Sequence, residues 1–248
     1  MKKTVAIIQA RVGSTRLPGK VLLDLKGKTV LNHVVDRVKK SKYIDEVIVA
    51  TTYLEQDDKI VDECNKIGCK YFRGSESNVL SRYYLCAKEN KADIVIRITS
   101  DCPLIDPLVI DEILDFYLKN NYKLVTNAGD IHNRTYPRGL DTEIFDFDTL
   151  ENAYKNANKD YQKEHVTPYI YENEKDIYYY KNDIDYSKYR LTLDTKEDFE
   201  LIKRIYDLVY IDSQNFYLDD IVKILLKQPD LEQINKHIKQ KQYKVNRG

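Results

Sequence analysis

"IIQARVGSTRLPGKVLLDL" (residues 7–25) joins the end of an apolar run to a loop with three cations, Arg11, Arg16 and Lys20. Two guanidinium forks and one ammonium suit a flexible polyanion such as a triphosphate. In an open α/β sheet, ligands bind at the carboxyl ends of the strands, and this loop follows the first expected strand. The sequence therefore predicts an anion site here in preference to an ordinary solvated loop.

The loop does not match either of the two common phosphate-binding motifs. Five residues separate Gly13 from Gly19, one more than in the glycine-rich loop of nucleotide hydrolases. Val21 follows Lys20, where that loop has the Ser or Thr that holds magnesium. The third glycine of the dinucleotide fingerprint is also missing. The loop has to be interpreted from its own charges.

The hydrophobic pattern alternates between short apolar runs and amphipathic helices in the first half of the chain. The expected strands cover 4–9, 46–51, 70–72, 93–98 and 123–126, and the expected helices cover 29–40, 56–67, 78–89 and 107–119. Such alternation is typical of an α/β domain whose parallel sheet is covered by helices on both faces. Arg97 is unexpected inside the apolar strand 93–98.

After residue 127 the pattern becomes mixed α+β. It predicts strands within 141–147, 176–182 and 189–195, and helices over 148–157, within 163–171, over 196–210 and over 218–226. We interpret residues 1–248 as a single domain with a mixed α+β insertion at about 134–188. The tyrosine cluster "IYYYK" in this insertion is either a homodimer contact or an ordinary tyrosine-rich strand.

The composition restricts the classes of partner. Forty basic and 40 acidic residues cancel in a chain of 248 residues, which argues against a broad binding surface for nucleic acid or anionic membranes. The four cysteines lack C-x-x-C spacing, and the chain begins with a strand-like segment rather than a signal peptide. No apolar run reaches the length of a bilayer span. These features predict a cytoplasmic protein that uses its charge locally.

Two aspartates stand at expected strand ends that are far apart in the sequence. Asp101 follows the strand that contains Arg97, and Asp194 ends a later apolar run. Carboxylates at such ends are suited to hold one or two Mg²⁺ ions beside a triphosphate. Asp106 and Thr195 have a simpler explanation as helix caps.

Two further polar clusters are candidates for substrate binding. Arg134, Arg138 and Asp141 lie in the turn-rich segment "RTYPRGLD", and Glu164 and His165 stand at an expected helix start. Arg138 suits bidentate binding of a substrate carboxylate. Glu164 and His165 are more often explained by a helix N-terminus, which favours negative charge, and by an ordinary histidine.

These motifs together resemble the cytidylyltransferases that activate acidic sugars. The segments that carry the resemblance run through almost the whole chain: "IIQARVGSTRLPGKVL", "EVIVATT", "FRGSESNVLSRYY", "IVIRITSDCPLIDP", "TYPRGLDTEIF", "EHVTPYIY" and "RLTLDTKEDFELI". The nearest branch is the spore-coat polysaccharide type, related to the enzymes for Kdo and acylneuraminate. The resemblance implies a nucleotide-diphospho-sugar transferase fold, which is α/β and Rossmann-like, with a mostly parallel central sheet and a mixed α+β dimerisation region.

The resemblance also implies CTP as a substrate, Mg²⁺ as a cofactor and a homodimer. It assigns catalysis to Arg16 and Lys20, and metal binding to Asp101 and Asp194. It assigns nucleotide binding to Ala10, Arg11, Gly13, Ser14, Arg16, Lys20, Arg73, Gly74, Ser75 and Ser100. It assigns binding of the acceptor substrate to Arg138, Glu164 and His165.

The activity expected from this resemblance is transfer of CMP from CTP to an acidic sugar or a phosphorylated small molecule. Pyrophosphate would be released, and the product would serve surface polysaccharide or glycoconjugate biosynthesis. Kdo enzymes carry Gln-Gly-Asp before the metal-site proline, whereas this chain has Thr99-Ser100-Asp101, so the identity of the acceptor stays open.

Two other functions are compatible with the same residues. A glycosyltransferase would use a nucleotide-sugar donor and commonly an Asp-x-Asp motif, where this chain has Asp101-Cys102-Pro103. A non-catalytic nucleotide-binding or nucleic-acid-binding module would use the tyrosines and the basic C-terminal tail. In the three-cation loop, Lys20 is expected to be an exposed lysine, whose removal changes stability by at most about 0.5 kcal/mol.

Overall fold

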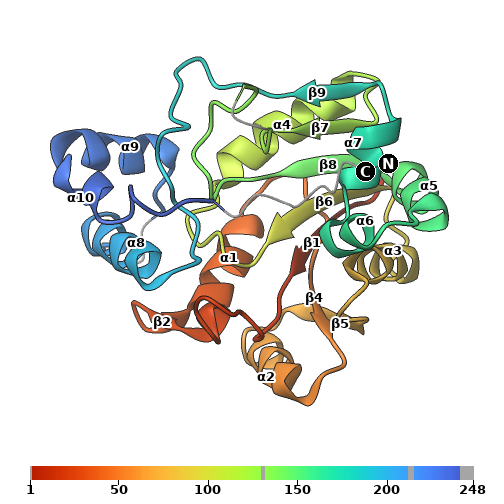
Figure 1. The fold of residues 1–248 in the computed structure, drawn as a ribbon, viewed down its shortest axis with the longest axis horizontal. Helices are drawn as coiled ribbons and strands as arrows, with labels where there is room; N and C mark the ends of the chain where they lie inside the picture. Colours follow the sequence, from red (N-terminus) through yellow and green to blue (C-terminus); the bar gives the residue numbers. More distant parts are fainter. Residues whose placement is uncertain (1, 130–131, 212–214, 241–248) are drawn as a thin grey trace.

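The computed structural model describes residues 2–129, 132–211 and 215–240, so residues 241–248 of the basic tail lie outside the described residues. Among the described residues, seven strands form one sheet in the order β5-β4-β1-β6-β8-β7-β9 (Figure 1). These strands are β1 (Thr4–Gln9), β4 (Glu46–Thr52), β5 (Lys70–Gly74), β6 (Ile94–Thr99), β7 (Leu124–Thr126), β8 (Glu143–Asp146) and β9 (Ile177–Tyr179). A small hairpin of β2 (Asp24–Leu25) and β3 (Lys28–Thr29) lies outside the sheet.

Helices cover both faces of the sheet. They are α1 (Val30–Val38), α2 (Asp58–Lys66), α3 (Val79–Glu89), α4 (Pro107–Lys119), α5 (Phe147–Asn156), α6 (Asp160–His165), α7 (Pro168–Asn173), α8 (Lys196–Val209), α9 (Leu218–Lys227) and α10 (Asp230–Gln233). Two short 3-10 helices, η1 (Lys20–Leu22) and η2 (Glu55–Asp57), lie in the loops after β1 and β4.

Strand β1 lies inside the sheet because both of its faces are apolar. Val5 and Ile7 belong to the core on the side of α3, and Ala6 and Ile8 belong to the core on the side of α1 and α4. All four are fully buried, as a parallel strand between two helical layers requires. β1 pairs in parallel with β4 and β6, and β4 pairs in parallel with β5, which confirms the predicted parallel sheet.

Strand β8 reverses the direction of the sheet. It pairs antiparallel with both β6 and β7, whereas β7 and β9 are parallel to each other. Arg97 of β6 lies opposite Glu143, the first residue of β8, so the beginning of β8 is near the carboxyl end of β6. The polar residue that looked out of place in the sequence therefore has a carboxylate partner on the neighbouring strand.

Two predicted elements of the second half are wrong. Residues 189–195 do not form a strand, and only Arg190 pairs, in an isolated bridge with Arg138. The backbone N of Leu193 donates instead to the carbonyl of Asp101, and that of Asp194 donates to the side chain of Asp198 in α8. The helix predicted within 163–171 is two helices, α6 and α7, separated at Val166, whose φ is 72°. Pro168 favours this break because it has no backbone N–H to continue the hydrogen bonds of α6, and its fixed φ suits the first position of α7.

No helix in the described ranges combines the length and the apolar character that crossing a membrane would require.

A close backbone contact at Gly139 joins the loop before β8 to the segment before α8. Gly139 has a φ of 101°, and a Cβ there would lie 2.4 Å from the carbonyl carbon of Leu191. Leu191 N donates to Arg138 O at 2.7 Å across the same contact. Glycine is required both by the positive φ and by this approach. The contact holds the segment that leads to Asp194.

We expect Gly139→Ala to lower the free energy of unfolding by about 3 kcal/mol or more, because left-handed strain adds to overlap with the backbone of Leu191. Gly68→Ala is the matched control. Its φ is 60°, but nothing lies within 4 Å of the added Cβ, so strain alone should cost about 1 kcal/mol. Urea unfolding of both variants measures the difference, and equal losses would contradict the close contact.

Candidate active site

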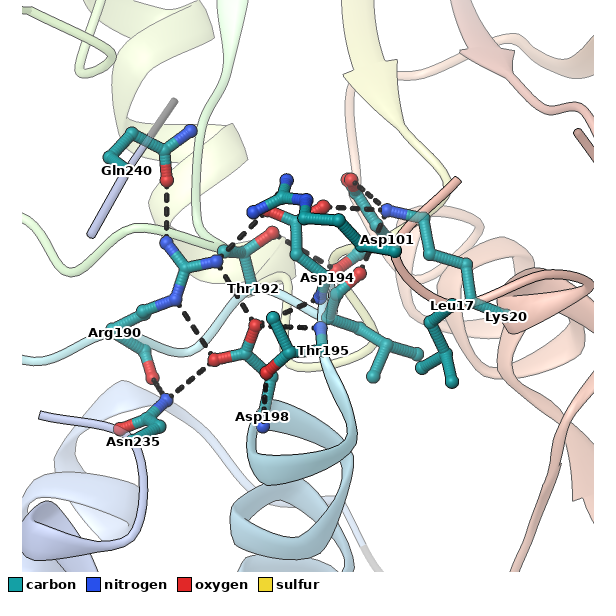
Figure 2. A network of polar contacts seen from close by, with 12 residues as sticks. Leu17, Lys20, Asp101, Arg190, Thr192, Asp194, Thr195, Asp198, Asn235 and Gln240 are labelled. Atoms are coloured by element: carbon teal, nitrogen blue, oxygen red, sulfur yellow. Dashed lines mark hydrogen bonds and ion pairs between the residues drawn. The ribbon is translucent and has the colours of Figure 1, made fainter. Parts of the chain in front are cut away.

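Three segments meet at the carboxyl ends of β1 and β6. The loop after β1 brings Lys20, the turn after β6 brings Asp101, and the segment before α8 brings Asp194 (Figure 2). Lys20 Nζ lies 2.8 Å from Asp101 Oδ2 and 2.8 Å from Asp194 Oδ1, and it donates to the carbonyl of Leu193 at 2.8 Å. One ammonium therefore joins two carboxylates from remote parts of the chain.

Asp194 is also held by two arginines. Arg16 NH2 and Arg190 NH2 lie 2.8 Å and 2.9 Å from Asp194 Oδ2. Both oxygens of this carboxylate thus face cations, and two of these cations, Arg16 and Lys20, come from the loop that the sequence predicted to bind an anion. The structure brings together four of the five residues predicted to bind the triphosphate and the metal, Arg16, Lys20, Asp101 and Asp194. Arg11, the fifth, pairs with Glu76 instead.

The helix caps predicted beside these aspartates are present. Thr195 accepts from the backbone N of Asp198, and Asp198 accepts from the backbone N of Thr195 at 3.0 Å, which makes a capping box at the start of α8. Asp106 accepts from Leu108 N at 2.8 Å and caps α4. Neither cap therefore needs a catalytic explanation.

The pKa values of Lys20 and Asp101 are shifted in opposite directions by their contact. Burial raises the pKa of Asp101. The charge and the hydrogen bond of Lys20 lower it, and together with the hydrogen bonds of Thr99 and Cys102 they outweigh burial, so the pKa lies below its ordinary value of 3.8. Burial lowers the pKa of Lys20, but Asp101 and Asp194 raise it above its ordinary value of 10.5. Both groups are therefore charged at neutral pH.

The two carboxylates form a suitable donor set for a hard divalent cation. Asp101 and Asp194 converge on one point, where Lys20 Nζ now lies. Magnesium takes one or two carboxylates together with phosphate oxygens and water. Within the described residues there is no group of three or more His, Cys, Asp or Glu side chains that would hold a metal by itself. A cation at this point requires Lys20 to move away.

The predicted nucleotide residues lie in or directly after β5 and in the segments after β1 and β6. Arg11 NH1 lies 3.7 Å from Glu76, so the loops after β1 and β5 approach each other. Arg73 donates to the carbonyls of Thr52 and Leu54 and pairs with Asp58 at 2.7 Å. Arg73 thus holds the loop after β4 and does not join the Lys20 cluster.

The remaining predicted residues, all within the described part of the chain, do not hydrogen-bond to the Lys20 side chain. Ala10 and Ser100 are buried, and Ser100 N donates to Gln9 O at 3.1 Å. Gly13 and Ser14 lie in the loop before Lys20, Gly74 ends β5, and Ser75 accepts from Asn78 N at the start of α3. Arg138 lines a cavity of about 180 Å³ that also contacts Arg190 and Gln240 and lies outside the Lys20 cluster.

Glu164 and His165 end α6 and do not start a helix, which corrects the prediction. The helix starts earlier, at Asp160, because Gln162 accepts from the backbone N of Lys159. Burial lowers the pKa of His165, and the nearby charges of Arg97 and Arg11 lower it further against the opposing effect of Glu164.

A family model of cytidylyltransferases matches residues 5–243. The chain belongs to the cytidylyltransferase family. The spore coat polysaccharide biosynthesis protein SpsF of Bacillus subtilis is 34% identical over 93% of this chain and 97% of its own. A solved cytidylyltransferase from Leptospira borgpetersenii is 37% identical, with a TM-score of 0.88 over 98% of this chain and 100% of its own. A CMP-2-keto-3-deoxy-manno-octonic acid synthetase complexed with CTP has a TM-score of 0.67 at 21% identity, over 84% of this chain and 99% of its own.

Membership of the family confirms the resemblance seen in the sequence. The cytidylyltransferase is an enzyme that transfers nucleotidyl groups, so the non-catalytic alternative is wrong. Its sheet and helices have the nucleotide-diphospho-sugar transferase fold that was predicted.

Sequence reasoning missed several polar side chains around the site. Arg97 pairs with Glu143, which also accepts from the hydroxyl of Tyr171 at 2.8 Å. Arg82 of α3 is only 2% exposed, and its Nε and NH1 have no hydrogen-bond partner among the described residues of the cytidylyltransferase. A cation inside an apolar strand was a usable signal for Arg97. The burial of Arg82 had no such signal, because arginine is common on helix surfaces.

The expected exposure of Lys20 is wrong. The Lys20 side chain is only 12% exposed, because it enters the space between Asp101 and Asp194. Its removal leaves two carboxylates close together in a partly buried site. The small stability effect expected for a loop lysine therefore does not apply to this cytidylyltransferase.

We expect Lys20→Met to lower the free energy of unfolding by about 3 kcal/mol at pH 7, because one partner of a buried ion pair is removed. The pKa of Asp101 is lower in the folded protein, so the stability that the ion pair contributes is fully present above the ordinary pKa of 3.8. It is lost as the pH falls through the pKa of Asp101 in the folded protein. The pKa of Lys20 is raised, so the contribution is present below 10.5 and is lost as the pH rises through the folded value. The variant and parent should thus differ most between about pH 5 and pH 10.

Urea unfolding across this pH range tests the expectation. Lys119→Met, which removes a lysine of an exposed pair with Asp115, serves as the control and should change stability by at most about 0.5 kcal/mol. A Lys20→Met protein that matches the parent at pH 7 would show that the buried pair does not stabilise the fold.

Proposed function

We propose that this cytidylyltransferase transfers CMP from CTP to an acidic sugar or a related acidic or phosphorylated acceptor and releases pyrophosphate. The observation that carries the proposal is the cluster of Arg16 and Lys20 against Asp101 and Asp194. It combines cations for a triphosphate with carboxylates for a divalent cation at the carboxyl ends of two strands. Surface polysaccharide or glycoconjugate synthesis is the use that the likeness to SpsF supports.

In this proposal the loop after β1 binds the β- and γ-phosphates. Arg11 and Arg16 offer planar forks and Lys20 a point charge, which together neutralise the triphosphate. The acceptor oxygen attacks the α-phosphorus in line, the bond from that phosphorus to the bridging oxygen breaks, and pyrophosphate leaves. A proton released by a hydroxyl acceptor passes to solvent or pyrophosphate. Arg16 and Lys20 stabilise the negative charge that grows on the leaving group.

Asp101 and Asp194 are the residues that we propose to hold Mg²⁺. When bound, the ion supplies positive charge at the phosphate oxygens. Lys20 would leave the two carboxylates and pair with the triphosphate. The positive charge of Lys20 beside the aspartates would then be replaced by that of Mg²⁺. Positioning and charge neutralisation account for most of the rate in such a transfer.

The acceptor end of the site is proposed at α6 and β8. His165 lies in the electrostatic field of Arg97 and Arg11, which supports a position beside the nucleotide for His165 and Glu164. Arg138 stays a prediction for this role. We also propose that the enzyme works in the cytoplasm, which the four buried, unbridged cysteines support.

The glycosyltransferase alternative is not favoured by any residue of the site. In an Asp-x-Asp motif that began at Asp101, the second carboxylate would stand where this chain has Pro103. Cys102, between Asp101 and Pro103, is buried. The family also favours a nucleoside triphosphate as the donor.

We expect Asp101→Asn and Asp194→Asn each to lower the rate of pyrophosphate release from CTP by at least about a hundredfold. The assay uses Mg²⁺ and a panel of acidic sugars and phosphorylated acceptors. Because both variants empty one shared cation site, the double variant should be little slower than either single variant. Asp115→Asn, which changes a carboxylate on the exposed face of α4, is the control for the substitution itself.

A double variant whose loss equals the product of the two single losses would contradict the shared site. Release of a nucleoside diphosphate from a sugar nucleotide, with CTP inactive against every acceptor, would instead support the glycosyltransferase.

We also propose a homodimer built from the region of residues 134–188. β9 is an edge strand of the sheet, and such edges are open to pairing or must be covered. Tyr178 on this strand is 36% exposed, and Ile184 after it is 58% exposed. The rings of Tyr178 and Tyr180 also contact Phe116 of α4, so part of the tyrosine cluster packs within the chain.

We expect light scattering at micromolar concentration to give twice the 29.2 kDa mass of the chain. Ile184→Asp should shift the protein toward the monomer, because a charge in an apolar interface is costly. Ile211→Asp is the control, since Ile211 is 59% exposed and lies outside the region. A monomeric parent protein would refute the dimer, and equal effects of both variants would refute this location.

A further inference from the structure

We propose that Arg190 is a positioning residue that orients the carboxylate of Asp194 for the divalent cation. The inference rests on the proposed function, in which Asp194 is a metal ligand. Sequence reasoning had placed Arg190 in an ordinary strand, and the site described above does not use it for substrate. Its guanidinium nevertheless contacts Asp194 and also Asp198, which accepts a hydrogen bond from the backbone N of Asp194 (Figure 2).

The guanidinium of Arg190 bridges two carboxylates. Its Nε lies 2.9 Å from Asp198 Oδ1, and its NH2 lies 3.0 Å from Asp198 Oδ2 and 2.9 Å from Asp194 Oδ2. Asp198 is fully buried and also accepts from the backbone N of Asp194 at 3.0 Å. The arginine and Asp198 therefore fix both the main chain and the side chain of Asp194.

Arg190 differs from the other two cations on Asp194 in its surroundings. Arg16 and Lys20 belong to the loop that we propose to bind the triphosphate, so their contacts with Asp194 are exchangeable. Arg190 is only 9% exposed, and its NH1 donates to Gln240 at 2.5 Å. Asn235 donates to the carbonyl of Arg190 at 2.9 Å. These contacts keep Arg190 in place when the loop cations move.

The contacts of Arg190 also determine which carboxylate oxygen of Asp194 is available to a divalent cation. Arg190 holds Oδ2, while Oδ1 faces Lys20 and, through it, Asp101. With Oδ2 fixed, rotation of the carboxylate away from Asp101 is restricted. Hydrogen-bond partners of this kind, behind a metal ligand, change metal affinity or activity by about 10- to 100-fold when they are altered.

The test is Arg190→Lys, which keeps the positive charge and removes the planar fork. Mn²⁺ is titrated into the enzyme with saturating CTP, and free Mn²⁺ is read by electron paramagnetic resonance. We expect the Kd for Mn²⁺ to rise by about 10- to 100-fold, with CTP affinity in EDTA unchanged within about twofold. The rate of pyrophosphate release should fall and should recover in part at high Mn²⁺.

Two further variants separate positioning from a general loss of packing. Arg37→Lys changes another buried arginine, which donates to the carbonyl of Phe216 at 3.0 Å and lies over its ring, without contact to the aspartates. It should lower stability but leave the Kd for Mn²⁺ unchanged. Asp198→Asn removes the charge partner of Arg190 and should weaken Mn²⁺ binding in the same direction, which tests the idea if Arg190→Lys does not fold.

The outcome with Asp194→Asn distinguishes this inference from the proposed function. If Asp194→Asn abolishes Mn²⁺ binding while Arg190→Lys and Asp198→Asn retain the parental Kd, the metal site stands and the positioning role is overturned. If Asp194→Asn itself retains the parental Kd, Asp194 is not a ligand, and both the metal assignment and the role of Arg190 are overturned.

Discussion

The contact of Lys20 with Asp101 and Asp194 is the interaction on which the arrangement of the site depends. It joins the loop after β1, the turn after β6 and the segment before α8, which the sheet alone does not connect. Because the lysine is mostly buried, its charge and hydrogen bond also keep the pKa of Asp101 below its ordinary value. In the proposed function, the chemistry of the site uses the same three side chains that join these segments in the fold.

The charges around Asp194 are balanced within the described part of the chain. Arg16, Lys20 and Arg190 face Asp101, Asp194 and Asp198 at distances of 2.8 to 3.0 Å. A triphosphate that attracts Arg16 and Lys20 leaves the aspartates with uncompensated charge, and a divalent cation restores the balance. In the proposed function, nucleotide and metal thus favour each other's binding. The inner pair of Arg190 and Asp198 is not affected by this exchange.

Prediction from sequence succeeded where the signal is local. β1 and α4 have the predicted bounds, Thr4–Gln9 and Pro107–Lys119, because an apolar run marks the strand, and Asp106 before Pro107 marks the start of the helix. The cations of the first loop and Asp101 follow β1 and β6 as predicted, whereas Asp194 follows a segment that is not the predicted strand. The segment 189–195 was misread because an apolar alternation does not show whether a neighbouring strand exists. The burial of Lys20 and the role of Arg190 depend on partners that only the fold brings near.

The reversed direction of β8 has a consequence for how such an enzyme diversifies. The loop that follows a parallel strand lies at the carboxyl edge of the sheet. In β8 the residues before the strand lie there instead, because Glu143 lies opposite Arg97 near the carboxyl end of β6. Changes of length or composition just upstream of β8 therefore act on one part of this edge only. The loops after β1 and β5, on the other side of β6, are left intact. In the proposed function the acceptor lies at this end, so its contacts can change without altering the loops that bind the donor.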